Sequence, residues 1–132
     1  MPEVNWLAVV AAAVVSFLIG GLWYSPVMFL KAWQRGSGVT DAQMQSGHPL
    51  KIYGGGLVLS LIASAVFAMF LGPKPEVGFA TSAGFAAGLC WVTTSFGINY
   101  LFERKSLTLF LVYGGYHTLQ FTLIGLVLGL WH

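Results

Sequence analysis

The sequence contains few charged residues, and this shortage excludes several classes of protein. Only 8% of its 132 residues are Asp, Glu, Lys or Arg, whereas a soluble domain carries about 25%. An ordinary water-soluble globular domain is therefore excluded. The net charge of +2 is also too small for the basic surface that nucleic-acid binding requires. We expect no nucleic-acid partner.

Cysteine and paired acidic residues are similarly scarce. Cys90 is the only cysteine, which excludes an internal disulfide and a cysteine-based zinc site. The sequence also lacks a hydrolase nucleophile elbow, a phosphate-binding loop and a pair of carboxylates. Because intramembrane chemistry normally needs several convergent titratable groups, we expect that the protein is not an enzyme. No cofactor or metal is predicted.

Apolar residues, by contrast, are abundant and are grouped in four long runs. They make up 57% of the chain, and a transmembrane helix needs about 20 of them in succession. The runs cover residues 6–24, 52–71, 77–102 and 107–131. The sequence therefore predicts an all-α fold, an integral membrane four-helix bundle, in a single domain over residues 1–132. The lipid bilayer is its expected surroundings.

The positions of the basic residues predict how the bundle is oriented. Lys74 lies between the second and third spans, whereas the other five basic residues lie in the gaps 31–51 and 103–106: Lys31, Arg35, Lys51, Arg104 and Lys105. Because basic loops stay on the cytoplasmic side, both of these gaps should be cytoplasmic. We therefore expect a multi-pass protein of the bacterial inner (plasma) membrane with both termini on the outer side.

The gaps also predict local structure and helix neighbours. In the cytoplasmic loop 31–51, Thr40 and Gln43 have the spacing of a capping box, which predicts a short interfacial helix near 41–46. Two prolines in the turn 72–76 should close a tight hairpin, so that spans two and three lie side by side. The equally short turn 103–106 should make spans three and four neighbours.

Each span carries small residues at intervals of about four. Helices in a bilayer associate through such close-packing faces, because lipid is as apolar as their side chains. Intramolecular packing would use these faces, but four helices present more of them than one bundle needs. We favour intramolecular packing for these faces and keep self-association as the alternative. The faces are Ala8, Ala12, Ser16 and Gly20; Gly56, Ser60, Ser64 and Ala68; Ala80, Gly84 and Gly88; and Gly125 and Gly129.

Polar residues within the spans fall at two depths. A rise of about 1.5 Å per residue places Ser16, Ser60, Thr93 or Thr94, and His117 near the midplane, where they could form one layer. We expect His117 to hydrogen-bond a hydroxyl of this layer. We favour a neutral packing role for His117. The functional alternatives are a proton relay, which would usually have a carboxylate partner in the membrane, and a tetrapyrrole ligand, for which the spans offer no second His. Thr118, Gln120 and Thr122 lie further out and could simply line the bundle.

A second polar group lies closer to the cytoplasmic side. It contains Ser95, Asn99, Glu103 and Tyr113. The first three are spaced by four residues and therefore share one helix face. We expect Asn99 to hydrogen-bond across to span four or span one.

The sequence resembles a known family of small membrane proteins. The resemblance covers essentially the whole chain and rests on the residues Asn5, Trp6, Gly20, Gly21, Leu22, Trp23, Tyr24, Ser25, Pro26, Phe29, Lys31, Ala32, Trp33, Asn99, Tyr100, Leu101, Phe102 and Glu103. The family is the one catalogued as domain of unknown function 1761, in which Gly is expected where this chain has Leu30. The resemblance implies four spans and no agreed activity, and it points to Trp23, Tyr24, Pro26, Trp33, Asn99 and Glu103, all near the cytoplasmic face.

These observations favour a non-enzymatic membrane component. The leading hypothesis is an interaction or assembly protein, either a homo-oligomer or an accessory subunit of a larger membrane complex. The alternative is a small oligomeric carrier or channel in which the midplane layer around His117 lines a path. Together with Tyr113 and His117, the six residues indicated by the family resemblance form the candidate functional set.

Overall fold

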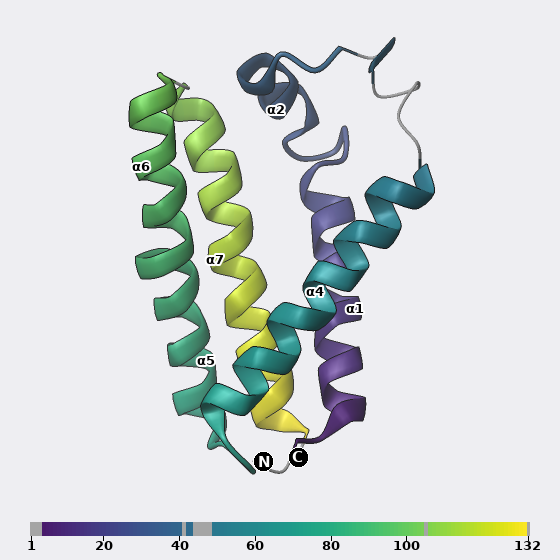
Figure 1. The fold of residues 1–132 in the computed structure, drawn as a ribbon, viewed down its shortest axis with the longest axis vertical. Helices are drawn as coiled ribbons and strands as arrows, with labels where there is room; N and C mark the ends of the chain where they lie inside the picture. Colours follow the sequence, from purple (N-terminus) through teal and green to yellow (C-terminus); the bar gives the residue numbers. More distant parts are fainter. Residues whose placement is uncertain (1–3, 41, 44–48, 105, 132) are drawn as a thin grey trace.

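The computed structural model describes residues 4–40, 42–43, 49–104 and 106–131, and these are almost entirely helical (Figure 1). The helices are α1 (Trp6–Trp23), α2 (Leu30–Ser37), α4 (Pro49–Leu71), α5 (Val77–Ala87), α6 (Thr94–Glu103) and α7 (Leu107–Leu130), with a π-helical segment η1 (Gly88–Thr93) joining α5 to α6. Four segments are long and apolar enough to cross a membrane: Trp6–Trp23, Leu50–Leu71, Val77–Glu103 and Leu107–Leu130. The all-α prediction with four such helices is confirmed.

Both ends of the described chain lie at the same end of the bundle. α1 begins and α7 finishes beside each other there, and α2 lies at the opposite end (Figure 1). The side-chain amide of Asn5 donates to the carbonyl oxygen of Trp131 at 3.3 Å and ties the two helices together. We refer to these two ends as the terminal end and the α2 end.

Side chains cap the starts of three helices. Asn5 accepts a hydrogen bond from the backbone N–H of Ala8, and Ser106 accepts one from Leu109. Glu76 accepts from Gly78 and Phe79, each at 2.9 Å. These two backbone donors hold the pKa of the Glu76 carboxyl below its usual range. The caps satisfy backbone donors that have no partner within the helix.

The capping box of the first loop is present. The hydroxyl of Thr40 accepts from the backbone N–H of Gln43, and the Gln43 side chain accepts from the N–H of Thr40. Most of the helix predicted at 41–46 lies outside the described residues, although Ala42 and Gln43 are helical.

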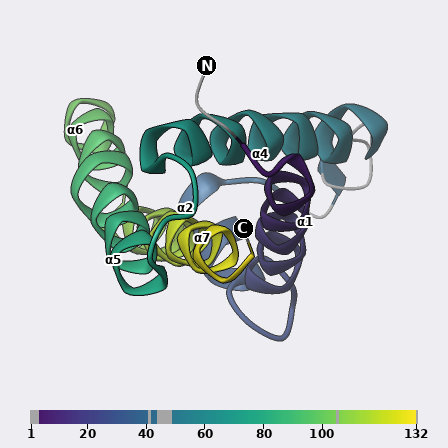
Figure 2. The ribbon, with the colours of Figure 1, turned by 90° about the horizontal axis from the view of Figure 1, so that it is seen from below.

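α7 is the central helix of the bundle. It packs against α5, η1 and α1 along its length and against α2 at one end (Figure 2). Its contact with α5 is a seam of glycines in which Gly84 faces the backbone of Phe121 and Gly125 faces the backbone of Ala80. Spans three and four are therefore neighbours, as predicted, and the small-residue faces serve to pack the chain on itself.

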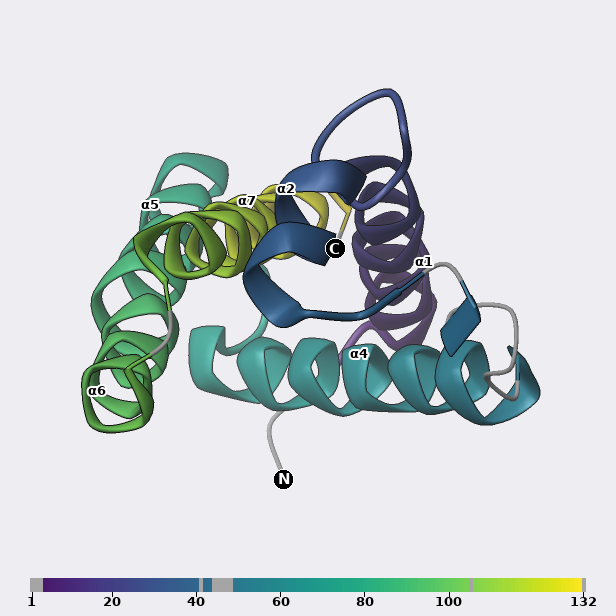
Figure 3. The same cartoon turned by 90° about the horizontal axis from the view of Figure 1, so that it is seen from above.

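The prediction that spans two and three lie side by side is wrong. α4 packs mainly against α1 and makes no comparable contact with α5 or α6 among the described residues. The reason is that each helix packs through its small residues. Ser60, Ser64 and Ala68 of α4 are buried, and α1 is the main neighbour of α4. The glycines of α5 instead pack against the backbone of α7. At its Pro49 end, α4 leans away from α6, as Figures 1 and 3 both show.

The third span is interrupted by the π-helical turn η1. The Thr93 hydroxyl donates to the carbonyl oxygen of Gly88, five residues earlier, at 2.7 Å. A π turn inserts one residue relative to an α-helix. The side chains of α6 therefore point in other directions than they would if α5 continued as an uninterrupted α-helix.

Candidate functional site

Aromatic side chains from α1, α2, α6 and α7 gather at the α2 end. We call this group the aromatic cluster, and it consists of Tyr24, Trp33, Phe96, Tyr100, Tyr113 and Tyr116. The Tyr24 ring lies 6.0 Å from Trp33, 6.1 Å from Tyr113 and 5.5 Å from Tyr116, between ring centroids. Edge and tilted packing of this kind stabilises aromatic groups beyond the area they bury.

Two indole N–H groups fasten the segment after α1 to α7. Trp23 donates to the backbone carbonyl of Val112 at 2.9 Å, and Trp33 of α2 donates to the Tyr113 hydroxyl at 2.8 Å. The Trp23 ring also packs 4.5 Å from Phe29. α2 therefore lies on the end of α7 rather than apart from the bundle. Pro26 is exposed in the turn between α1 and α2.

His117 lies at the inner edge of the aromatic cluster. Its ring stacks on Phe96, with 5.2 Å between the centroids and 15° between the planes, and lies 4.9 Å from Tyr116. Its Nδ1 is 2.7 Å from the side-chain oxygen of Gln120. The expected bond from His117 to a hydroxyl of the midplane layer is wrong, because the amide of Gln120 takes that place.

A chain of hydrogen bonds links α7 to α1 through Gln120. The Gln120 amide nitrogen donates to the Ser16 hydroxyl at 2.7 Å, so its oxygen is left to accept from His117. This arrangement places the proton of a neutral imidazole on Nδ1. Gln120 is 6% exposed and Ser16 is 0% exposed. Gln120 therefore lies in the interior and connects two helices.

The predicted single midplane layer divides into separate groups. The Thr93 hydroxyl lies 3.1 Å from the carbonyl oxygen of Gly114 and 3.3 Å from the Thr118 hydroxyl, between η1 and α7. Ser60 is buried in α4. Thr94 is exposed, and its hydroxyl donates to the carbonyl oxygen of Cys90, four residues earlier in the third span. Among the described residues of the predicted layer, Ser16 and His117 are the pair that is connected, and Gln120 connects them.

Asn99 and Glu103 do not join the aromatic cluster. Both are exposed, and the Asn99 amide has no hydrogen-bond partner in the part of the chain that the structure describes. The expected bond from Asn99 to span four or one is therefore wrong. In a continuous α-helix Asn99 would lie three turns from Gly88, on the same face. The π turn instead places Thr93 on that face and turns Asn99 outward.

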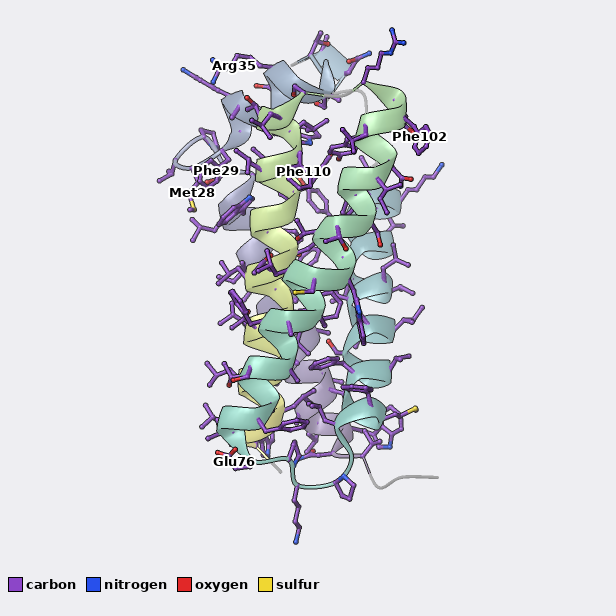
Figure 4. All side chains as sticks on the ribbon, turned by 90° about the vertical axis from the view of Figure 1, so that its left-hand side faces the viewer. Met28, Phe29, Arg35, Glu76, Phe102 and Phe110 are labelled. Atoms are coloured by element: carbon purple, nitrogen blue, oxygen red, sulfur yellow. The ribbon has the colours of Figure 1, made fainter. Side chains whose placement is uncertain are left out.

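One face of the third span collects the exposed polar residues and two large aromatic ones. We call it the α6 face: Trp91, Ser95, Asn99, Phe102 and Glu103. Trp91 is 65% and Phe102 is 86% exposed, and Figure 4 shows Phe102 projecting outward from α6. A shallow groove of about 330 Å³ lies along this face, lined by Trp91, Val92, Ser95, Phe96 and Asn99. None of the residues of α6 is buried.

Three residues that surround His117 were not in the candidate functional set. Phe96 and Tyr116 enclose His117, and Gln120 bonds it. Gln120 lies three residues after His117 on α7, a spacing that places two side chains on one helix face. That spacing was the available signal. Among the described residues, no group of three or more His, Cys, Asp or Glu side chains could hold a metal ion.

Comparison with known proteins connects this site to a family. A sequence model of the family described as protein of unknown function (DUF1761) matches residues 7–129. The chain belongs to this family. No curated protein and no solved structure matches it. The resemblance noted from the sequence is thus confirmed for the DUF1761 family, and it brings no activity with it.

The residues to which the resemblance pointed fall into two groups with different surroundings in this DUF1761 protein. Trp23, Tyr24 and Trp33 hold α1 and α2 against α7 through the contacts described above. Asn99 and Glu103 contribute nothing of that kind and lie on the α6 face. The candidate set therefore divides into a structural part and an exposed part.

Proposed function

We propose that the protein is a non-enzymatic four-span component of the bacterial inner membrane that acts by association, as an interaction or assembly protein or an accessory subunit. The single observation that supports this proposal is the α6 face. It presents the amide of Asn99, which has no hydrogen-bond partner among the described residues, and the carboxylate of Glu103 on a segment otherwise apolar enough to cross a membrane.

The chemistry of the α6 face is that of a contact surface. Lipid tails offer no hydrogen-bond partner, and polar side chains on membrane helices bond to neighbouring helices instead. Exposed Trp is also among the residues that contribute most to protein interfaces. The face combines a central polar residue with Trp91 and Phe102 beside it. This combination supports association through α6.

The small-residue faces no longer support association. Ala8, Ala12, Ser64 and Ala80 are almost completely buried inside one chain, and Gly84 and Gly125 meet backbone of the neighbouring helix. These small residues are therefore buried between helices of the same chain and are not available to a partner. The proposal therefore rests on the α6 face alone.

The carrier or channel alternative has less support. It requires a path that reaches His117 from water. The His117 ring is instead stacked on Phe96 and bonded to Gln120, which is itself bonded to Ser16. These contacts favour a packing role for His117.

The proposed orientation places the α2 end in the cytoplasm. Arg35 and Glu76 lie at opposite ends of the bundle (Figure 4), and Lys74 adjoins Glu76. In a Cys90→Ala background, we expect Lys74→Cys in intact spheroplasts to react with a membrane-impermeant maleimide. Arg35→Cys should react only after permeabilisation. Labelling of both variants from the same side would contradict the proposed topology.

Asn99→Leu tests the association proposal. Replacing the amide should remove a hydrogen bond to the partner and weaken the complex about tenfold, which corresponds to the ~1–2 kcal/mol that one polar side chain contributes between membrane helices. The measurement is the mass of the particle that contains the tagged chain, after extraction with native lipids. The mass of the wild-type particle should exceed that of the monomer, and the mass of the Asn99→Leu particle should be closer to that of the monomer.

Ser82→Leu is the matched control. Ser82 is also an exposed polar residue on the third span but lies outside the α6 face, so its loss should leave the particle mass unchanged. A wild-type particle of monomer mass would refute the association proposal. Equal effects of Asn99→Leu and Ser82→Leu would show that association does not depend on the α6 face.

A further inference from the structure

We infer that the partner of the α6 face is a second copy of the same chain, related by a two-fold axis along the membrane normal. This inference rests on the proposed function and specifies its partner. It predicts a parallel dimer in which Ser95 and Asn99 of one copy lie against Ser95 and Asn99 of the other.

The α6 face is chemically complementary to itself. An Asn side chain carries both a donor and an acceptor, so two Asn99 amides can bond to each other. Glu103 and Arg104 are adjacent and of opposite charge, and both are exposed. Each could therefore pair with the other residue type in a second copy. A second copy of the chain therefore offers a partner for both polar groups, the Asn99 amide and the Glu103 carboxylate.

The membrane supplies the symmetry. Copies of one protein insert with the same orientation, so a given residue lies at the same depth in each. A two-fold axis along the membrane normal then brings each residue of the face close to its own equivalent. Ser95 is small enough to let two helices approach closely, and its hydroxyl already donates to the carbonyl oxygen of Trp91 in the same span, at 2.7 Å.

The fold leaves room for a second helix on this face. α4 meets the third span near Phe70, whose ring lies 6.5 Å from that of Trp91. Toward the α2 end, α4 leans away from α6 (Figures 1 and 3). The shallow groove of about 330 Å³ is lined by Ser95 and Asn99 and by no residue of α4. A neighbouring α6 could therefore contact Ser95 and Asn99 without displacing α4.

Disulfide trapping in native membranes tests the symmetry. Ser95→Cys, in a Cys90→Ala background with Asn99 intact, should form a covalent dimer of the full chain when copper phenanthroline is added as the oxidant. Leu101→Cys is the control, because Leu101 is 81% exposed and lies on another side of the same helix. It should remain monomeric. Equal trapping of both variants, or of neither, would overturn the inference.

A charge exchange tests the pairing independently. Glu103→Arg and Arg104→Glu should each reduce the co-purification of two differently tagged copies, because each places like charges across the axis. The double variant should restore it, since both charges are then exchanged. Failure of the double variant to recover, in protein that still folds by circular dichroism, would contradict a Glu103 to Arg104 contact between copies.

The outcomes separate this inference from the proposed function. If Asn99→Leu reduces the particle mass but the two tagged copies never co-purify, association through α6 stands and the partner is another protein. The inference of a second copy is then wrong. If Asn99→Leu changes nothing and the wild type is a monomer, both fail.

Discussion

Adding one methyl group at Gly84 should destabilise the protein by about 2 kcal/mol, even though Ala is the better helix former. A Cβ at this position would overlap the carbonyl oxygen of Phe121 and approach the Cα of Thr122 to 3.2 Å. Backbone cannot move aside as a flexible side chain can. Overpacking of this kind costs about 1–3 kcal/mol, which outweighs the helix-propensity gain of up to about 1 kcal/mol.

The matched control for Gly84→Ala has the opposite expected sign. Gly55 is exposed on α4, and a Cβ there would meet nothing within 4 Å. Gly55→Ala should therefore stabilise the helix by up to about 1 kcal/mol. SDS titration of the detergent-solubilised protein, followed by tryptophan fluorescence, measures both. If Gly84→Ala proved as stable as Gly55→Ala, the α5 to α7 seam would not be closely packed.

Gln120→Leu should lower the free energy of unfolding by about 2 kcal/mol, because it leaves the buried Ser16 hydroxyl and the partly buried His117 ring without their partner. Gln120 bonds to His117 on one side and to Ser16 on the other. An unpaired buried donor or acceptor costs about 1–3 kcal/mol, and the leucine recovers only part of this through its apolar surface. The same SDS titration measures the loss.

Two further variants separate the hydrogen bonds of Gln120 from its packing. Thr122→Val removes a hydroxyl that bonds only within its own helix, to the Thr118 carbonyl, and should change stability by less than about 0.5 kcal/mol. Ser16→Ala combined with Gln120→Leu should cost less than the sum of the two, with a coupling of about 1 kcal/mol. Strict additivity would show that the bond between Ser16 and Gln120 contributes nothing.

The sequence was sufficient to predict the helices and their close-packing faces. Long apolar runs report helices directly, because the hydrocarbon of a bilayer excludes charge over about 20 residues. Small residues at intervals of about four are buried on all four long helices, as Ala12, Ser64, Gly84 and Gly125 illustrate. These features depend only on local periodicity, which can be read without knowing the neighbours.

The sequence was not sufficient to predict which helix lies beside which. The short turn at 72–76 fixes the distance between two helix ends but leaves the helices free to diverge, and α4 turns to α1. Counting residues gave the depth of His117 and Asn99 but not the direction in which each points. One inserted residue in η1 changes that direction for all of α6, and no motif in the sequence predicted this π-helical turn.

The hydrogen bond between Asn5 and Trp131 joins the first and last helices at the terminal end. Because both ends of the described chain lie at the same end of the bundle, a genetic fusion of two copies would need no tether that crosses the bilayer. Four crossings are an even number, so the second copy would enter the bilayer from the same side as the first. A tandem gene could thus encode both halves of the proposed symmetric pair in one polypeptide, with no additional membrane-crossing helix between them.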